Sequence, residues 1–296
     1  MIYAQNMVPR GKLAIIGGNE AKKPETSLSN ENHQHVDFNN GVLDEILREL
    51  NEKPVIEILP LASEDQAELG NNYIEAFKKL NQPAKVMIIK NRKEVDQVSN
   101  LQRLEQAGIV FFTGGDQVKL AKMLENTQFL EILKNKYFHD EFIIAGTSSG
   151  AMVMAEHMIS GGENDEAILK GIITMEKGLG IMCNVIIDTH FLSRGRFSRL
   201  TEALLIHNKS IGIGICEDTG LIVSQDRYLR VVGSGTAIIM EGKSMKHTNY
   251  HSVKEKDPVF IENMIIHLLA KGSGFDMLEN KFLIYDEKKT PKEMQL

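Results

Sequence analysis

Cysteine is scarce in this sequence: only Cys183 and Cys216 occur, and they do not form the C-x-x-C spacing of redox and metal sites. This scarcity excludes a disulfide scaffold. The sequence also lacks any run approaching the roughly 18 apolar residues of a membrane span, and residues 1–10 lack the long apolar core of a signal peptide. We therefore expect a cytoplasmic protein that does not enter a membrane. Secretion is the alternative, with residues 1–6 as the remnant of a trimmed leader.

An excess of positive charge is absent as well. The 34 Lys and Arg residues are outnumbered by 40 Asp and Glu residues, which gives a net charge of -6. Proteins that track a nucleic-acid backbone need a basic surface, so nucleic acid is not expected as a partner. No repeat, low-complexity tract or linker divides the 296 residues. We expect one α/β domain over residues 1–296, with a short polar tail from about residue 286.

Short apolar runs rich in β-branched residues alternate with amphipathic helical patterns in the first half of the chain. Continuous apolar runs of this kind are typical of strands that are buried on both faces. The alternation predicts an α/β fold with a mostly parallel sheet flanked by helices, and ligands should gather beyond the carboxyl ends of its strands. The predicted strands are residues 13–16, 55–61, 85–89, 109–112 and 142–145, and the predicted helical stripes are residues 42–50 and 120–133.

After residue 150 the pattern changes to apolar runs separated by Gly, Asp and Ser, which predicts further strands, some of them antiparallel. A late helix is predicted over residues 258–271, because apolar residues recur there at helical spacing and Pro258 suits the first turn. The predicted strands of this half are residues 184–187, 212–216, 220–223, 228–232 and 236–240.

The sharpest local motif is G-x-S-x-G at residues 146–150, where the strand at 142–145 hands over to a predicted helix. Such a strained turn projects a serine hydroxyl above the sheet and lets substrate and backbone come close. Ser148 occupies the nucleophile position, and the backbone N–H of Ser149 suits an oxyanion hole. The alternative is a Gly/Ser loop that binds nothing.

A second glycine turn follows the strand at 109–112 and should open on the same edge of the sheet as Ser148. Gly114 or Gly115 can offer a backbone N–H where a side chain would block the substrate, and we assign Gly115 as the second oxyanion donor. The alternative is an ordinary strand-to-helix turn capped by Asp116, and the two roles are compatible.

A serine hydroxyl needs a general base, usually a histidine held by a carboxylate. Among nine histidines, His190 stands out because it follows the strand-like run 185–188. Glu217 ends another strand in a turn and is the favoured carboxylate, with Asp218 as its rival. Asp188 lies two residues before His190 on the same strand face, so we interpret it as a structural or binding group.

Three arginines, Arg194, Arg196 and Arg199, crowd in behind His190 within six residues. Guanidinium groups bind carboxylates through paired hydrogen bonds, so this segment is a candidate for substrate binding. The alternative is a solvated charge run.

Taken together, five short blocks of this sequence, which include the motifs described above, resemble the cyanophycinase group of peptidase family S51. The resemblance implies a class I glutamine-amidotransferase-like (flavodoxin-like) fold, a homodimer, no metal and no organic cofactor. Members of that group cut cyanophycin, an aspartate-backbone polymer with arginine on each side-chain carboxylate, into β-Asp-Arg dipeptides. The matching blocks are F-F-T-G-G-D-Q at 111–117, G-T-S-S-G-A at 146–151, D-T-H-F-L-S-R-G-R-F-S-R-L at 188–200, residues 212–219 and V-G-S-G-T at 232–236.

The resemblance also assigns roles to single residues. Ser148, His190 and Glu217 would form the catalytic triad. Thr189 departs from the usual glutamine of the family, Ser149 from the usual alanine, and Cys216 from a common aspartate. The residues expected to bind substrate are Gln117, Asp188, Thr189, Arg194, Arg196 and Arg199.

Three alternatives frame the functional prediction. An α/β-hydrolase esterase places its acid before the histidine, whereas here His190 precedes Glu217. An Asp-X dipeptidase of the same family would share the site and differ in substrate. A binding protein that keeps the fold without catalysis would have no need of a complete triad.

Overall fold

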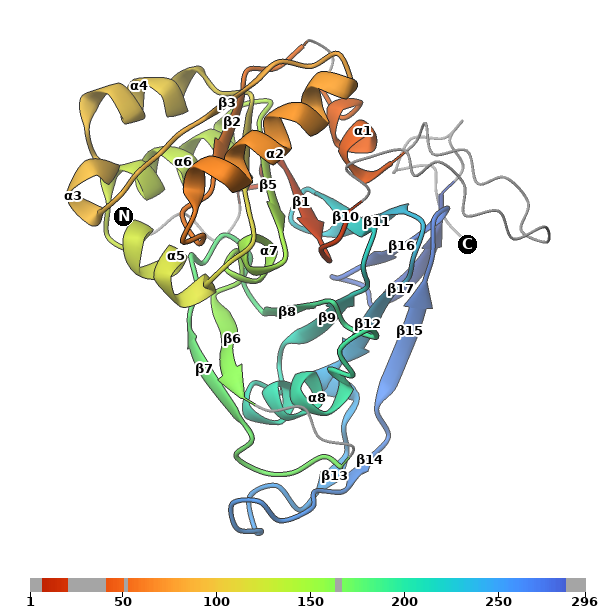
Figure 1. Ribbon diagram of the computed structural model, residues 1–296. Coiled ribbons are helices and arrows are strands. Elements are labelled where there is room, and N and C mark those ends of the chain that lie inside the picture. The colour runs from red at the N-terminus through yellow and green to blue at the C-terminus, as the bar shows by residue number, and fades with distance from the viewer. Residues whose placement is uncertain (1–6, 21–40, 51–52, 163–166, 286–296) are drawn as a thin grey trace, which may run out of the picture.

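The computed structural model describes residues 7–20, 41–50, 53–162 and 167–285 (Figure 1). The polar tail predicted from residue 286 lies outside the described residues. The described part contains a sheet of nine strands, a sheet of four strands and two short two-stranded sheets. None of its helices has both the length and the apolar surface needed to cross a lipid bilayer.

One half of the nine-stranded sheet is parallel and is built from the first half of the chain. Its order is β1-β5-β4-β2-β3, and each neighbouring pair runs parallel. The predicted α/β fold with helices on a parallel sheet is thereby confirmed, and β4 coincides with the predicted run 109–112. The strands are β1 (Lys12–Ile16), β2 (Ile56–Leu59), β3 (Ala84–Val86), β4 (Ile109–Phe112) and β5 (Ile143–Thr147).

Helices cover both faces of these parallel strands (Figure 1). Side chains alternate along β1, so Leu13 and Ile15 join one hydrophobic cluster with α4, α5, α6 and α7, whereas Ala14 and Ile16 join another with α1 and α2. The helices are α1 (Val42–Leu47), α2 (Gln66–Lys79), α3 (Arg92–Val95), α4 (Val98–Gln106), α5 (Gln117–Leu124), α6 (Gln128–His139) and α7 (Ser149–Met152).

Capping side chains decide where several of these helices begin. Asp65 accepts the backbone N–H of Glu68 at the start of α2, at 2.8 Å. Thr127 caps α6 through the N–H of Leu130, and Asn126 before it has a positive φ of 53°. The single helical stripe predicted over 120–133 is therefore two helices, because a cap and a left-handed residue interrupt it.

The other half of the nine-stranded sheet is antiparallel and comes from the end of the chain. β10 pairs with β1, and the order continues outward as β10-β11-β16-β17. The sheet is therefore mixed, as the antiparallel runs predicted after residue 150 require. These strands are β10 (Thr219–Ser224), β11 (Tyr228–Gly233), β16 (Ser273–Asp276) and β17 (Lys281–Ile284).

The second sheet has the order β15-β12-β9-β8, in which β8 and β9 are parallel, and α8 packs beside them. The β6–β7 hairpin extends away from the large sheet toward β13 and β14 (Figure 1). These elements are β6 (His157–Gly162), β7 (Ile173–Lys177), β8 (Val185–Thr189), α8 (Phe197–Ile206), β9 (Ile211–Ile215), β12 (Ala237–Glu241), the 3-10 helix η2 (Gly242–Ser244), β13 (His247–Thr248), β14 (Ile261–Glu262) and β15 (Ile265–Leu269).

The helix predicted over 258–271 is wrong. The segment forms β14 and β15, and β15 pairs antiparallel with β12 from Ala237 to Glu241. Of the apolar residues in β15, Leu269 is buried, whereas Ile265 and Leu268 are exposed. The apolar spacing therefore did not mark one buried helical face, and pairing with the open edge of β12 outweighed it.

Candidate active site

Ser148 lies in the turn between β5 and α7 with φ 53° and ψ -120°, a conformation that non-glycine residues rarely adopt. The flanking glycines make this turn possible. A Cβ on Gly146 would lie 2.2 Å from the carbonyl oxygen of Gly150, and a Cβ on Gly150 would lie 2.4 Å from that of Phe112. The G-x-S-x-G motif therefore holds the serine in a tight strand-to-helix turn at the edge of the sheet.

His190 and Glu217 lie at the carboxyl ends of two neighbouring parallel strands. His190 follows β8 directly, and Glu217 comes two residues after β9. The Oγ of Ser148 is 3.0 Å from Nε2 of His190, and Nδ1 of His190 is 2.8 Å from Oε1 of Glu217. The structure thus brings the three predicted triad residues into one hydrogen-bonded chain.

Burial differs along this chain. The His190 side chain is 8% exposed, whereas that of Glu217 is 36% exposed. Hydrogen bonds from His190 and then from Asn19 and Ser193 hold the pKa of Glu217 below its usual value, although burial acts in the opposite direction. The carboxylate is therefore ionised at neutral pH and is placed to orient the imidazole.

The two residues assigned to the oxyanion hole lie beside Ser148. Ser149 is the first residue of α7, so its N–H has no partner within that helix, and its hydroxyl donates to the carbonyl of Gly115. A Cβ on Gly114 would lie 3.3 Å from Cβ of Ser148, which shows how closely this turn passes the nucleophile. Asp116 caps α5 by accepting the N–H groups of Val118 and Lys119, as its alternative reading predicted.

Asp188, Arg196 and Arg199 form a separate cluster of charges behind His190. Nε and the terminal nitrogen of Arg199 each lie 2.6 Å from the carboxylate of Asp188. Nη1 of Arg196 lies 3.1 Å from the same carboxylate and 2.7 Å from the carbonyl oxygen of Thr189. The Asp188 side chain is fully buried. The structure therefore places these two arginines on a protein carboxylate, and their predicted contact with substrate stays a prediction.

The other residues predicted to bind substrate are scattered around the site. The Gln117 amide donates to the carbonyl of Ile159 on β6, at 3.1 Å. Thr189 is fully buried, and its hydroxyl has no hydrogen-bond partner among the described residues. Arg194 is exposed, and its backbone N–H donates to the carbonyl of His190. Of the three arginines, Arg194 is thus the exposed one.

Sequence reasoning missed Ser193, whose hydroxyl donates to Glu217, and Asn19, which helps to lower the pKa of that carboxyl. The glycine turn after β1, at residues 17–20, was the available signal for Asn19. Taken alone it is an ordinary turn, and it becomes informative only once β1 is known to lie between β5 and β10.

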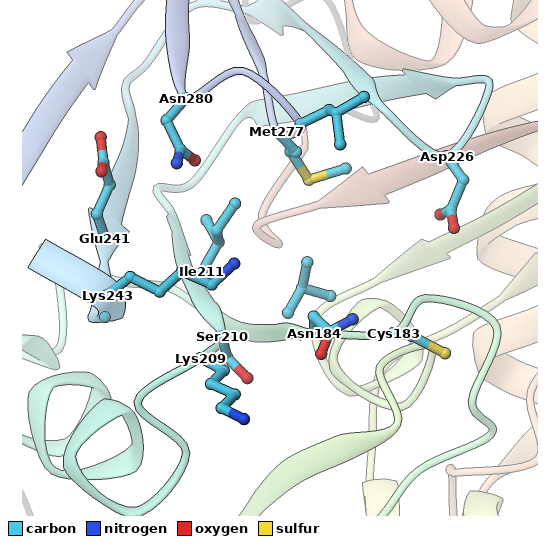
Figure 2. A pocket seen from close by; sticks show the side chains of 13 residues that line it. Cys183, Asn184, Lys209, Ser210, Ile211, Asp226, Glu241, Lys243, Met277 and Asn280 are labelled. Carbon is cyan, nitrogen blue, oxygen red and sulfur yellow. The ribbon is translucent and has the colours of Figure 1, made fainter.

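A cavity of about 360 Å³ lies at the amino ends of β8 and β9 in the small sheet. It is lined by Val185 and Ile211, the first residues of β8 and β9, whereas His190 and Glu217 follow the last residues of these strands. Figure 2 shows the side chain of Met277 reaching into this cavity. The cavity is therefore separate from the triad. Among the described residues, no group of three or more His, Cys, Asp or Glu side chains is placed to hold a metal ion.

A serine in a strained strand-to-helix turn, facing a histidine and a glutamate at the edge of an α/β sheet, is the arrangement of a serine-type hydrolase. The chain belongs to peptidase family S51, whose family model matches residues 27–231. It is accordingly a serine-type peptidase of the cyanophycinase-like kind.

Named relatives and a solved structure support this assignment. The chain is 35% identical to a cyanophycinase of Geminocystis herdmanii over 75% of this chain and 82% of that protein. It is 34% identical to a cyanophycinase of Nostoc sp. over 78% of each chain. The crystal structure of a peptidase from an acI-B1 actinobacterium matches with a TM-score of 0.61 at 21% identity, covering 94% of this chain and 100% of that one, which supports the fold.

Proposed function

We propose that this protein hydrolyses cyanophycin to β-Asp-Arg dipeptides with Ser148, His190 and Glu217 as its catalytic triad. The observation that carries the proposal is the hydrogen-bonded chain from Ser148 Oγ through His190 to Glu217, at 3.0 and 2.8 Å. The choice of substrate is supported by the relatives named as cyanophycinases.

The proposed reaction begins when Ser148 Oγ attacks the scissile carbonyl carbon and passes its proton to Nε2 of His190. The backbone N–H groups of Gly115 and Ser149 hold the negative oxygen of the tetrahedral intermediate, each contributing about 3 kcal/mol. The C–N bond then breaks, and His190 gives the proton to the leaving amine. Glu217 stabilises the imidazolium throughout. A water molecule, deprotonated by His190, releases the acyl group from Ser148 in the second half of the reaction.

Arg194 is the side chain best placed to hold the carboxylates of the polymer. It is exposed, and its backbone N–H is hydrogen-bonded to the carbonyl of His190, so its side chain begins within one turn of the chain from the triad histidine. Arginine binds carboxylates through two parallel hydrogen bonds. Arg196 and Arg199 bind Asp188 on β8 and so hold the start of α8 in place.

Incubation of the purified protein with cyanophycin, with identification of the soluble products, tests the proposal. We expect β-Asp-Arg dipeptides from the wild type and none from Ser148→Ala, which should fold normally. Short α- and β-aspartyl peptides form a second substrate set. If the protein cleaves those peptides but leaves cyanophycin uncleaved, it is an Asp-X dipeptidase instead.

A reactive phosphonate tests the nucleophile without any assumption about substrate. We expect it to label Ser148 in the wild type and to leave Ser148→Ala unlabelled. Absence of labelling together with absence of turnover would favour a binding protein on this fold.

The homodimer is proposed from the family resemblance. Light scattering coupled to size exclusion measures it directly, and a mass equal to one chain at working concentration would contradict it.

A further inference from the structure

The turn after β1, at residues 17–20, is hydrogen-bonded to the backbone of each segment that carries a triad residue. The carbonyl just before the turn accepts the N–H of Ser148 at 3.0 Å. Inside the turn, the carbonyl of Gly17 accepts the N–H of His190 at 2.9 Å. The next carbonyl accepts the N–H of Asp218, the residue after the triad glutamate, also at 2.9 Å. The three segments therefore meet at one short stretch of chain.

The two glycines of this turn are required by its closeness to the site. A Cβ on Gly17 would lie 1.9 Å from the carbonyl oxygen of Cys216. Gly18 has φ 102°, and a Cβ there would lie 2.3 Å from Cε1 of the His190 ring. The imidazole thus packs directly against the backbone of Gly18, and a displacement of the turn would displace the imidazole as well.

Glu20 anchors the turn through its side chain. The residue is buried, with 4% of its surface exposed. One carboxylate oxygen accepts the hydroxyl of Thr147 at 2.8 Å, and the other accepts the hydroxyl of Tyr73 on α2. Because Thr147 directly precedes Ser148 in the chain, the carboxylate joins the turn to the strand that carries the nucleophile.

Tyr73 gives this carboxylate a fixed partner on α2. Its side chain is buried, and its ring lies against that of Phe111 on β4, with the ring centroids 4.8 Å apart. Burial and then the charge of Glu20 raise the pKa of Tyr73 well above its usual value. The hydroxyl therefore keeps its proton and donates it to the carboxylate.

The direction of the Thr147 side chain follows from the alternation of side chains along β5. Ile143 and Ala145 belong to the hydrophobic cluster that packs against α2, and Thr147, two residues further on, points to the same face of the sheet. The helix that follows Ser148, α7, packs in the cluster on the opposite face. Glu20 thus holds β5 from the face away from α7.

The backbone conformation of Ser148 makes such a restraint important. Its φ of 53° and ψ of -120° are rarely adopted by non-glycine residues, and a conformation of this kind persists only where the surrounding contacts hold it. Gly150 provides one restraint after the serine, because it passes close to the backbone of Phe112. The hydrogen bond between Thr147 and Glu20 provides another restraint before the serine.

We propose that Glu20 is a positioning residue for the reaction: its buried carboxylate joins the turn after β1 to Thr147 and so holds Ser148 Oγ in line with Nε2 of His190. This inference rests on the proposed function. Glu20 acts through Thr147 and through the backbone of the turn, and it takes no part in the proton transfers.

Thr147→Val and Tyr73→Phe form a matched pair, because each removes one hydroxyl that donates to Glu20 and keeps the rest of the side chain. The contact to Thr147 leads to the nucleophile, whereas the contact to Tyr73 leads to α2. We expect kcat to fall about 30-fold in Thr147→Val and to stay within about twofold of wild type in Tyr73→Phe, with KM nearly unchanged in both. Urea should unfold both variants at a lower concentration than the wild type, because each leaves a buried oxygen without its donor.

Substitution of Glu20 itself tests whether the contact or the charge matters. Glu20→Ala removes both hydrogen bonds, and we expect kcat to fall about 100-fold. Glu20→Gln removes the charge but keeps the size of the side chain and groups that can hydrogen-bond both hydroxyls. We expect it to restore kcat to within about threefold of wild type. An equal loss of kcat in both variants would contradict positioning through these hydrogen bonds.

Phosphonate labelling of Ser148 gives a measurement that depends on no substrate. The final amount of label counts the folded sites, so that a slow variant is distinguished from a partly unfolded one. We expect full labelling of Thr147→Val at a reduced rate. A purely structural role of Glu20 predicts instead wild-type kcat and labelling rate per folded site in Thr147→Val, with only its stability lowered.

That result, or an equal loss of kcat in Thr147→Val and Tyr73→Phe, would overturn the positioning role. The proposed function would still stand if Ser148→Ala were inactive in the same assay. Unchanged turnover in Ser148→Ala would overturn the proposed function itself.

Discussion

Two acidic side chains flank His190 in very different surroundings, Asp188 on β8 and Glu217 after β9. Asp188 is fully buried and is bound by Arg199 through two nitrogens and by Arg196 through one. Glu217 is 36% exposed and is hydrogen-bonded to the His190 ring and the Ser193 hydroxyl. The first carboxylate is neutralised by cations, whereas the second keeps its charge among neutral donors.

The difference shows how a carboxylate's neighbours select its role. A buried carboxylate must be paired, and two guanidinium groups leave Asp188 with no free charge to offer a substrate. A partly exposed carboxylate with neutral donors stays ionised without a cation and can stabilise a neighbouring imidazolium. We therefore interpret Asp188 as a structural residue that holds the segment after β8 in place, and Glu217 as the carboxylate that takes part in catalysis.

Of the substitutions at these two carboxylates, Glu217→Gln should have the larger effect on activity. The substitution keeps the size of the side chain but removes the charge that stabilises the imidazolium, so we expect kcat to fall about 10⁴-fold. Unfolding by urea should show nearly wild-type stability, because the group is partly exposed. A variant with wild-type kcat would remove Glu217 from the triad.

Asp188→Asn should mainly lower the stability of the protein. Removing the negative charge leaves two guanidinium groups partly unpaired in a buried site, so we expect a loss of about 3–5 kcal/mol in the free energy of unfolding. Urea titration followed by circular dichroism measures it. A variant that unfolds like the wild type but has lost turnover would contradict the support role and place Asp188 in the chemistry.

The sequence predicted more of the nucleophile than of its surroundings. G-x-S-x-G specifies a local turn, and the apolar runs of β1 and β5 specify strands, so Ser148 could be placed from short stretches of chain. The pairing of Arg199 with Asp188 depends on how α8 packs back against β8, and the contact of Ser193 with Glu217 depends on β8 and β9 becoming neighbours. No short motif encodes either. The same reason explains the segment over 258–271, where pairing with β12 decided the structure.

Arg194 is exposed, unlike Arg196 and Arg199, which are bound to Asp188. Arg194→Ala should raise KM for cyanophycin about 10-fold with little change in stability, because a guanidinium pair with a carboxylate contributes about 1.5 kcal/mol at such a site. Arg10→Ala, at an exposed arginine far along the chain, is the control and should leave KM unchanged. Equal KM values in the two variants would exclude Arg194 from substrate binding.

A third carboxylate, Asp226, extends the comparison to an exposed residue whose carboxyl is only partly withdrawn from water. It lines the cavity at the amino ends of β8 and β9, and this partial desolvation raises its pKa from 3.8 to about 6 (Figure 2). A carboxyl whose pKa is raised by folding favours the folded state below pH 3.8, and this contribution is lost as pH rises through about 6.

Asp226→Asn should therefore stabilise the protein at pH 8 and leave its stability unchanged at pH 3.5, which makes the acidic measurement an internal control. Because the carboxyl opens on a cavity that water can enter, we expect only about 1 kcal/mol, or a rise of about 2–4 °C in Tm. Thermal unfolding of both proteins across this pH range measures the difference. Equal Tm values at pH 8 would mean that Asp226 is as well solvated as an ordinary surface carboxylate, and environment would then distinguish only the two carboxylates beside His190.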